Sequence, residues 1–448
     1  MKGQLLLINP WIHDFAAYDF WIKPLGLLYL ASYLRRNGYG ISYLDCLDPN
    51  HPLMLNRGGI KTPKRKGSGQ GQFFKEAIEK PYPLAGVPRK YNRYGIKPEA
   101  FQAALKGLDQ PSHILVTSMM TYWYGGVWET IAEAKKLFPG VPVTLGGHYP
   151  TLCPEHARGS QADFVITERA EVAWRRLIVD ILGGAIEYEP DLDHLDDLPY
   201  PAFDLLNRPE QLPILTSRGC PYRCTYCASH VLNPGFLRRD PVRVADEIEH
   251  WRNTLGVRHF SFYDDALLAD PEGMFVPLAK AMIRRRLDVR FHCPNGLHLN
   301  RIDQNTALLM RQAGFETIRF GFETSDPKRQ TETGGKVRNE HLEDACRYLR
   351  EAGYKPDEIG IYLICGLPGQ SAGEVAESIR YVQACGAKPV IAEYSPIPGT
   401  ALWDESVRTS AHDIAKEPLW HNNTLLPCAS TDLTYDRYRQ LKQLAKSK

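Results

Sequence analysis

Three closely spaced cysteines constrain this chain more than any other feature of its sequence. Cys220, Cys224 and Cys227 lie within eight residues of one another, in the segment SRGCPYRCTYCASH. Three thiolates on one loop can hold three irons of a 4Fe–4S cluster, whereas a cluster that only carries electrons takes four cysteines. The fourth iron would then be open to a ligand from outside the protein. A zinc loop and a disulfide are the alternatives, although structural zinc usually takes its fourth ligand from a second Cys/His knuckle, which His230 supplies poorly.

The spacing Cys-x3-Cys-x2-Cys resembles the signature of the radical S-adenosylmethionine (radical SAM) superfamily. The resemblance covers roughly residues 210–400. It implies that the open iron binds the amino and carboxylate groups of the methionine part of SAM. It also implies that an electron from the cluster cleaves SAM to a 5′-deoxyadenosyl radical, so an electron donor such as a flavodoxin or a ferredoxin is an expected partner.

Composition indicates an ordinary soluble protein of two or three domains. The chain has 448 residues, which is more than one typical hydrophobic core contains. Of these residues 43% are hydrophobic and 24% are charged, which is ordinary for a globular protein. A formal net charge of +2 gives no reason to expect nucleic acid or membrane as a partner. We find neither an apolar run of membrane-spanning length nor a signal peptide. Reduced thiols and an oxygen-sensitive cluster favour the cytoplasm.

The first 186 residues alternate between strand and helix patterns, as in an α/β sheet. We expect an N-terminal doubly wound, Rossmann-like domain over this range. The expected strands cover residues 5–9, 41–46, 114–118, 142–147 and 162–167, and the expected helices cover 24–38 and 126–138.

Two segments interrupt the alternation. Residues 49–98 form an insertion that is rich in glycine, lysine and aromatic residues and has no period. A connection of this length is usually functional or disordered, so it is either a solvated surface insertion or a lid over a bound ligand. Residues 187–213 are acidic and contain five prolines, which predicts a linker between domains.

A second series of strands and helices occupies residues 214–400. It begins with PILTSRG, which leads into the cysteine loop, and the later strands are expected at 259–265, 290–296, 317–323, 359–366 and 390–396. Six strands joined by helices predict a partial (βα)6 barrel, with the chemistry at the carboxyl ends of the strands. Residues 401–448 are expected to form a small C-terminal tail.

Several acidic residues lie where the barrel strands are expected to end. Asp264 and Asp265 follow the second strand, where the resemblance implies a contact with the methionine ammonium of SAM. The alternative is that they cap the next helix. Glu323 ends a segment that resembles the part of the family that abuts the SAM adenosine, and the alternative there is a buried, satisfied carboxylate.

Two further features of the barrel resemble the family. Gly366 and Pro368 belong to a Gly-Leu-Pro-Gly turn at the end of a strand, and this turn resembles the one that contacts adenine. Glycine permits the backbone to approach a ligand closely. Tyr226 occupies one of the aromatic positions that the family often fills near the cluster.

The N-terminal region resembles the cobalamin-binding domains that precede many radical SAM domains. The resemblance lies in LGGHYPTLCPE at 145–155 and in DDLPYPAFDLL of the linker. In a doubly wound sheet, ligands bind outside the carboxyl ends of the strands. Gly146 and Gly147 would let the backbone approach a corrin or its nucleotide tail. Another strand end offers hydroxyl groups from Thr117, Ser118 and Thr121.

The same region departs from the cobalamin-binding pattern in three ways. It lacks an Asp-x-His-x-x-Gly motif, so we expect cobalamin without a histidine on cobalt, and His148 is either a backbone-anchoring residue or a ligand. TERAE at 167–171 replaces a turn that is usually rich in glycine. Tyr122, Trp123 and Tyr124 either pack beneath a corrin or fill a crevice that has lost its cofactor.

The resemblance implies a radical SAM enzyme that uses a 4Fe–4S cluster, SAM and cobalamin. The expected reaction is methyl transfer to an unactivated carbon or phosphorus of a small molecule or peptide. One rival is a cobalamin-dependent radical cyclase, ring-contraction or rearrangement enzyme. A rival of another class is a non-catalytic cobalamin or cluster sensor, although a sensor needs no SAM site.

Overall fold

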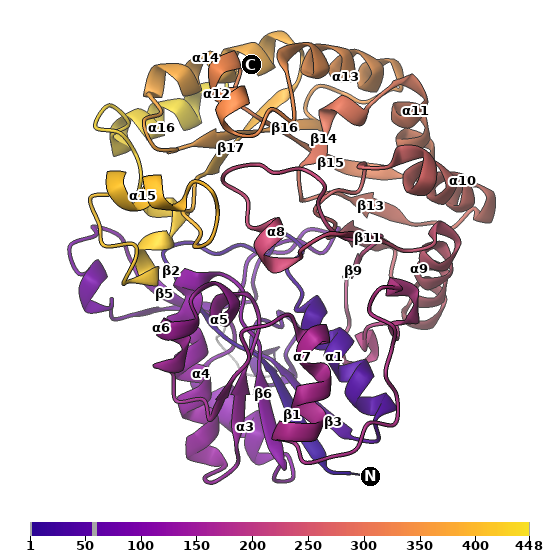
Figure 1. The fold of residues 1–448 in the computed structure, drawn as a ribbon, viewed down its shortest axis with the longest axis vertical. Coiled ribbons are helices and arrows are strands. Elements are labelled where there is room, and N and C mark those ends of the chain that lie inside the picture. Colours follow the sequence, from indigo (N-terminus) through magenta and orange to yellow (C-terminus); the bar gives the residue numbers. More distant parts are fainter. Residues whose placement is uncertain (1, 56–60, 448) are drawn as a thin grey trace. The chain divides into compact units, whose positions relative to one another are not determined.

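The computed structural model describes residues 2–55 and 61–447 and divides into two compact units. Unit 1 contains Met1–Glu210 and Lys416–Leu419, and unit 2 contains Gln211–Ala415 and Trp420–Lys448. Both are built around parallel sheets with helices (Figure 1), which confirms the α/β class. Within the described residues, no helix is both long and apolar enough to cross a membrane.

Unit 1 contains a five-stranded parallel sheet with the spatial order β3-β1-β6-β7-β8. In chain order this is 2-1-3-4-5, the doubly wound arrangement in which the strand order reverses beside the first strand. Strand β1 (Gln4–Asn9) is almost wholly buried and has an apolar sequence, as expected of a parallel strand covered on both faces. The strands are β1 (Gln4–Asn9), β3 (Gly40–Asp45), β6 (His113–Val116), β7 (Val143–Leu145) and β8 (Phe164–Val165).

Helices lie on both sides of this sheet, with α3 and α4 on one side in Figure 1 and α1 and α7 on the other. The expected helices at 24–38 and 126–138 correspond to α1 and α4. A basic last turn stabilises α1, and the chain leaves that helix through Gly38 at a φ of 85°. The main helices are α1 (Leu25–Arg36), α3 (Pro98–Lys106), α4 (Tyr124–Leu137) and α7 (Ala170–Arg176).

The insertion at 49–98 contains ordered antiparallel structure, with residues 56–60 lying outside the described residues. Strand β5 (Tyr91–Tyr94) pairs with β4 (Lys75–Ile78) on one side and with β2 (Ile12–Asp14) on the other. Phe73 and Tyr94 are buried in an apolar cluster. The described part of the insertion is therefore not solvated throughout, because its buried aromatic side chains pack with residues outside the insertion in one apolar cluster.

Part of the expected linker also packs in unit 1. The buried side chain of Asn37, just after α1, accepts hydrogen bonds from the amides of Glu187 (2.8 Å) and Tyr188 (3.0 Å). Ser32 donates from its hydroxyl to the carbonyl of Tyr200 at 2.6 Å. These contacts hold the acidic, proline-rich segment along α1.

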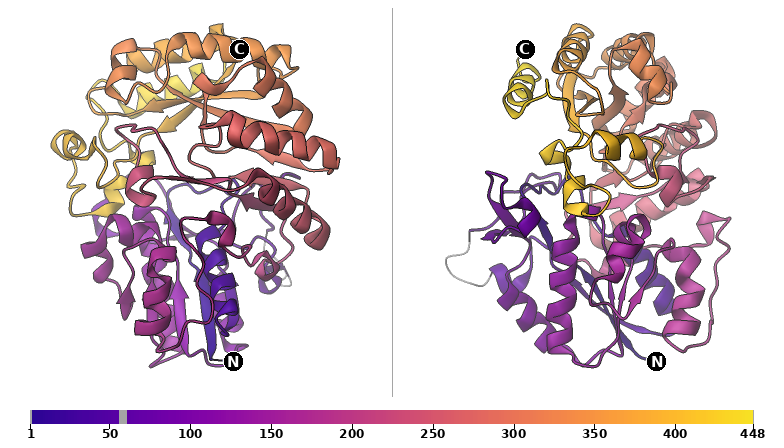
Figure 2. Two further views of the ribbon diagram at one scale, coloured as in Figure 1. Left: turned by 45° about the vertical axis from the view of Figure 1, so that its right-hand side comes forward. Right: turned by 60° about the vertical axis from the view of Figure 1, so that its left-hand side comes forward.

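Unit 2 contains six parallel strands that follow one another in space in their chain order, β9-β12-β13-β15-β16-β17. Figure 2 shows this curved sheet with its helices on the outside. The strands are β9 (Gln211–Ile214), β12 (His259–Phe262), β13 (Arg290–His292), β15 (Phe315–Glu323), β16 (Ile359–Cys365) and β17 (Lys388–Glu393), and β14 (Leu297–His298) pairs with β15. The helices are α9 (Pro241–Leu255), α10 (Val276–Arg285), α11 (Gln304–Ala313), α13 (Asn339–Glu351) and α14 (Ala372–Ala384).

One irregularity in this sheet matters later. Along the pairing of β13 with β15, Phe291 stands opposite Phe315 and His292 stands opposite Thr317. Glu316 is therefore an extra residue in a bulge, and a bulge changes the direction of the side chains around it. The phenylalanine rings pack against one another, with centroids 5.1 Å apart, on the apolar face of the sheet.

Most of residues 401–448 pack on unit 2. Helix α16 (Tyr435–Leu444) lies along α14, where the side-chain amide of Gln383 donates to the carbonyl of Leu444 at 2.9 Å. Ser406 in α15 (Trp403–Thr409) bonds to the hydroxyl of Tyr394 at 2.9 Å. Residues 416–419 instead belong to unit 1, where Glu417 accepts a hydrogen bond from the hydroxyl of Tyr124 at 3.0 Å.

Candidate functional site

The cysteine loop follows the short strand β10 (Ser217–Gly219), which pairs with β11 (Phe236–Arg238). Gly219 has a φ of 79°, and a Cβ there would lie 2.1 Å from the carbonyl oxygen of Gly235, so the position requires glycine. No disulfide joins Cys220, Cys224 and Cys227, which are all free thiols. The loop therefore begins at a fixed backbone turn.

The three loop cysteines are free thiols that differ in burial. Cys224 is buried, and Cys220 and Cys227 are half-buried. Burial raises the pKa of Cys220 to about 11 and also raises the pKa of Cys227. A thiol that binds a metal ion releases its proton when the metal binds. The amide of Ser229 donates to the sulfur of Cys227 at 3.4 Å, a contact that favours a negatively charged sulfur.

Asp264 holds the chain that enters the cysteine loop. Its fully buried carboxylate accepts hydrogen bonds from the hydroxyl of Thr216 at 2.6 Å, the amide of Thr216 at 3.0 Å and the hydroxyl of Ser217 at 2.7 Å. Burial raises the pKa of Asp264 to about 6, although these donors act to lower it.

Asp265 holds the chain that leaves the same loop. Its carboxylate accepts from the hydroxyl of Ser229 at 2.7 Å, at the start of α8 (Ser229–Leu232). Adjacent carboxylates thus anchor the two ends of the cysteine loop. The helix-cap position of the next helical segment is occupied by Asp270, which accepts from the amide of Gly273.

We predict that Asp264→Ala lowers the free energy of unfolding by about 3 kcal/mol or more, because three buried donors lose their acceptor at about 1–3 kcal/mol each. Urea unfolding of the iron-free protein measures this change. Asp265→Ala is the matched control, and we expect a smaller loss because it removes one partly buried hydrogen bond. Equal losses in the two variants would contradict the assignment of Asp264 as the main anchor.

Glu323 and Tyr226 meet at a buried lysine that the sequence did not single out. Lys336 lies 3.1 Å from a carboxylate oxygen of Glu323 and 3.3 Å from the hydroxyl of Tyr226. The side chains of Lys336 and Glu323 are 13% and 11% exposed. Burial alone would lower the pKa of Lys336, but the Glu323 carboxylate and the neighbouring cysteines raise it above its usual value. The lysine is therefore a charged ammonium beside the cysteine loop.

The backbone around this ion pair is closely fitted. Glu323 itself has a φ of 73°, which is unusual for a residue with a side chain. A Cβ on Gly334 would lie 3.0 Å from the Cα of Cys224, and the amide of Thr225 donates to the carbonyl of Thr333 at 3.3 Å. The turn before Lys336 thus lies directly on the cysteine loop. Its Gly-Gly pair at 334–335 was the only sequence signal that could have pointed to this contact.

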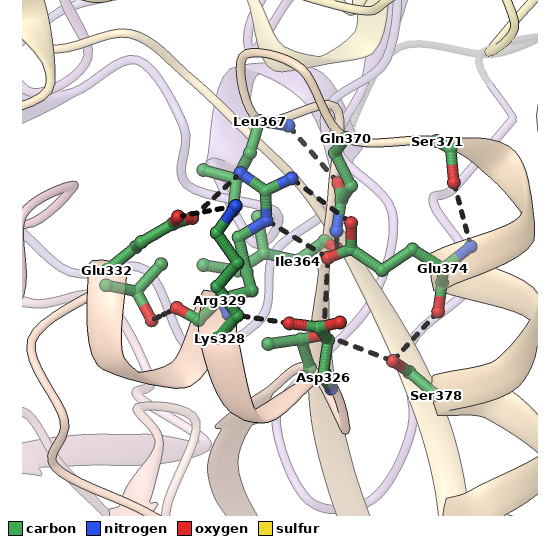
Figure 3. Close-up of polar contacts among 12 residues, drawn as sticks. Asp326, Lys328, Arg329, Glu332, Ile364, Leu367, Gln370, Ser371, Glu374 and Ser378 are labelled. Carbon is green, nitrogen blue, oxygen red and sulfur yellow. Dashed lines mark hydrogen bonds and ion pairs between the residues drawn. The ribbon is translucent and has the colours of Figure 1, made fainter.

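The Gly-Leu-Pro-Gly turn after β16 is held by Gln370, as Figure 3 shows. The side-chain oxygen of Gln370 accepts from the amides of Gly366 at 2.9 Å and Leu367 at 3.3 Å, and its nitrogen donates to the carbonyl of Ile364 at 3.0 Å. Gly366 has a φ of 98°, which explains the glycine. Hydrogen bonds made by one side chain therefore hold the turn in this conformation.

Arg329 links this turn to the preceding strand. It lies in α12 (Pro327–Glu332), after β15, and forms two parallel hydrogen bonds of 3.1 Å with Glu374 in α14 (Figure 3). It also donates to the carbonyl of Pro368 at 3.3 Å. Such a bidentate pair fixes both position and direction. The ends of β15 and β16 are thus held together by side chains that sequence analysis did not identify.

In unit 1 the structure brings four of the predicted residues together. Gly147 has a φ of 100°, and a Cβ there would lie 2.3 Å from the carbonyl oxygen of Ser118. The Ser118 hydroxyl donates to the carbonyl of Gly146 at 2.8 Å, and the amide of His148 donates to the carbonyl of Ser118 at 3.1 Å. The ends of β6 and β7 therefore meet in one turn, with the His148 side chain exposed at the start of α5 (His148–Leu152).

The remaining predicted residues of unit 1 differ in exposure. Thr117 is half-buried, and Thr121 is buried at the start of a short helical turn. In the segment that replaces the glycine-rich turn, Glu168 is exposed and forms an ion pair with Arg176 at 3.1 Å.

The aromatic residues after β6 are buried by protein. Tyr122 and Trp123 belong to the apolar cluster that contains Phe73 and Tyr94 of the insertion. The indole nitrogen of Trp123 donates to the buried carboxylate of Asp14 at 2.7 Å. The insertion and the segment around β2 therefore both contribute to the burial of these side chains.

Comparison with known proteins supports the radical SAM resemblance of the cysteine loop. Residues 214–382 match the family model of the radical SAM superfamily. This match confirms the prediction of a radical SAM domain with its 4Fe–4S cluster and SAM.

Individual relatives extend the comparison. The chain is 25% identical over 313 residues to an uncharacterized methyltransferase of Pyrococcus horikoshii, covering 62% of this chain and 66% of that protein. It is 22% identical to the cytidylyl-2-hydroxyethylphosphonate methyltransferase of Streptomyces wedmorensis, covering 90% of this chain and 82% of that protein. The fold resembles the radical SAM methyltransferase TsrM of Kitasatospora setae, solved with cobalamin and a [4Fe-4S] cluster, with a TM-score of 0.64, 15% identity and coverage of 92% and 76%.

Proposed function

We propose that this chain is a cobalamin-dependent radical SAM methyltransferase that acts on an unactivated carbon or phosphorus of a small molecule or peptide. The observation that carries the proposal is the cysteine loop, anchored at both ends by Asp264 and Asp265 and lined by the buried ammonium of Lys336. Free thiols beside a fixed positive charge suit an anionic iron–sulfur cluster. The methyltransferases among the relatives support the type of reaction.

Each side chain of the barrel has a proposed role. Cys220, Cys224 and Cys227 would hold three irons of the cluster, which when bound supplies the electron that cleaves SAM. Asp265 has one carboxylate oxygen bonded to Ser229, whereas Asp264 is engaged by three donors, so we assign Asp265 to the methionine ammonium.

The other end of SAM would lie on the strands that follow. The preformed turn of Gly366 and Pro368 offers backbone groups to the adenine, and Glu323 and Tyr226 would border the adenosine. The protein thus orients the substrate and excludes water, while the cofactors perform the difficult chemistry.

We further propose that residues 1–186 form a cobalamin-binding domain of Rossmann type, and that unit 2 is a partial (βα)6 barrel. The doubly wound strand order supports the first assignment, and the six sequential parallel strands support the second. A Cβ added to Gly146 would meet nothing within 4 Å, so there is room beside this backbone for a corrin or its tail. We place the enzyme in a reducing cytoplasm, with a flavodoxin or ferredoxin as electron donor.

We predict that Gly146→Val abolishes cobalamin binding without unfolding the protein, because the new side chain would occupy open space at the proposed site. Anaerobic gel filtration with hydroxocobalamin measures retention. Gly86→Val is the matched control, because Gly86 is another glycine of unit 1 with open space and no positive φ. Equal retention in both variants would place cobalamin elsewhere, and none in the parent would argue against a cobalamin domain.

A variant of His148 tests whether a histidine coordinates cobalt. We expect the electron paramagnetic resonance spectrum of the Co(II) form to be the same in His148→Ala as in the parent, because no histidine is proposed on cobalt. Nitrogen splitting that disappears in the variant would make His148 the ligand.

The proposed reaction is separated from its rivals by its products. Incubation of the anaerobic, reconstituted protein with SAM and an electron donor should give both 5′-deoxyadenosine and S-adenosylhomocysteine. A cyclase or rearrangement enzyme would give 5′-deoxyadenosine without the second product, and a sensor would give neither.

A further inference from the structure

A second group of metal-binding side chains lies at the end of the unit 2 sheet away from the cysteine loop. His259 is the first residue of β12, and Glu316 is the second residue of β15. One ring nitrogen each from His259 and His292 and one oxygen of Glu316 all lie within 4.8 Å of one another. Asp264 follows His259 by five residues, which corresponds to roughly 16 Å of extended chain. The group is therefore separate from the proposed SAM site.

The strand register brings these side chains to one face. His292 stands opposite Ser261, which is two residues beyond His259 on β12. Side chains two residues apart on a strand share a face, so both imidazoles lie on the same side of the sheet. The third group comes from the bulge in β15, where Glu316 is the extra residue before Thr317. Bulges often serve to redirect a side chain in this way.

The two imidazoles are arranged as a pair of ligands. Nδ1 of His259 lies 2.9 Å from Nε2 of His292, and the ring planes are 19° apart. Two nitrogens bound tetrahedrally to one zinc ion would be roughly 3.4 Å apart, so a small opening of the pair admits the ion. The other ring nitrogen of His292 lies 3.1 Å from the hydroxyl of Thr317. Ligating histidines usually make an outer hydrogen bond of this kind.

The charges also suit a cation. His292 is fully buried. Burial disfavours the charged form of an imidazole, and the neutral form is the one that binds a metal ion. Glu316 adds a carboxylate that at present pairs with Arg290 at 2.8 Å. The side chains of Glu316 and Arg290 are 46% and 43% exposed. Exposed ion pairs contribute little to stability, so an ion can displace Arg290 from Glu316 at little cost in free energy.

We propose that His259, His292 and Glu316 bind a divalent transition-metal ion, with Zn²⁺ as the best fit. Two imidazoles and one carboxylate form a known type of ligand set for such ions, and the exposure of Glu316 leaves room for water as a further ligand. The ion would tie β12, β13 and β15 together at their shared polar face. The proposal does not depend on the reaction at the cysteine loop.

Zinc binding to the full-length, cluster-reconstituted protein tests the proposal. Competition against a chromophoric chelator should give one zinc per chain. His259→Ala and Glu316→Gln should each weaken binding by at least about 10- to 100-fold, the loss that removal of an outer partner alone causes. His250→Ala is the control, because this exposed histidine of α9 lies in the same unit but outside the group.

Zinc should also raise the thermal unfolding midpoint of the parent and of His250→Ala, but not that of the two ligand variants. Glu316→Gln carries the test if His259→Ala does not fold, because the Glu316 side chain is exposed. Zinc binding that persists unchanged in Glu316→Gln, or that disappears when the three loop cysteines are replaced, would overturn the proposal. No zinc binding by the parent would overturn it as well.

Discussion

Replacing Cys220, Cys224 and Cys227 together by alanine will abolish the broad visible absorption of the reconstituted protein and its content of about four irons per chain. The reason is that these three thiols lie on one loop and none is used in a disulfide. The same variant should form no 5′-deoxyadenosine, because SAM cleavage requires the electron from the cluster. Iron analysis, absorption spectra and chromatography of the nucleoside products measure the three effects.

The matched control is a variant that removes other accessible thiols. Cys153 and Cys385 are half-buried and lie outside the loop, so Cys153→Ala with Cys385→Ala should keep the full cluster. The cysteines nearest the strand ends, Cys293 and Cys365, are wholly buried and belong to the core. A full cluster in the triple loop variant would disprove the assignment of the ligands.

Lys336→Met will lower the free energy of unfolding by about 3–5 kcal/mol, the usual cost of leaving one partner of a buried ion pair alone. The carboxylate of Glu323 would then be almost fully buried with no opposite charge at 3.1 Å. The loss should also make the reduction potential of the cluster more negative, because a positive charge beside the cysteine loop favours the added electron. Urea unfolding of the iron-free protein and a redox titration of the reconstituted protein measure the two changes.

The double variant Lys336→Met with Glu323→Gln separates the ion pair from the packing of the lysine. Removing both charges should restore most of the lost stability and bring the potential back toward that of the parent. If the double variant is as unstable as Lys336→Met alone, the effect comes from lost packing. The pair would then contribute little.

The strand pattern was sufficient to predict the six parallel strands of unit 2 and the approximate positions of their ends. Strand β16 is recognisable as a continuous apolar run because both of its faces are buried, whereas the first part of β15 is apolar only at some positions. Asp264, Asp265 and Glu323 could be predicted as site residues because they lie at the carboxyl ends of parallel strands, where such folds bind their ligands. The three-stranded sheet of the insertion could not be predicted, because its strands are only three or four residues long and β2 is distant in the sequence.

The contacts of the site residues were equally hidden in the sequence. Asp264 meets Thr216 across 48 positions of the chain, and Lys336 meets Tyr226 across 110. Neither a periodic pattern nor a local motif indicates contacts between residues so far apart in the sequence. The sequence therefore indicated where carboxylates would stand but not that two of them anchor the cysteine loop, nor that a lysine neutralises the third.

The return of residues 416–419 to unit 1 has a consequence for the synthesis of the protein. These residues follow the entire six-stranded sheet in the chain, and Glu417 supplies the acceptor for the hydroxyl of Tyr124. A ribosome must therefore translate all six strands of unit 2 before unit 1 can be completed. Unit 1 therefore cannot complete its folding before unit 2 has been synthesised. A gene divided after Glu210 would encode an N-terminal fragment that lacks residues 416–419 of unit 1.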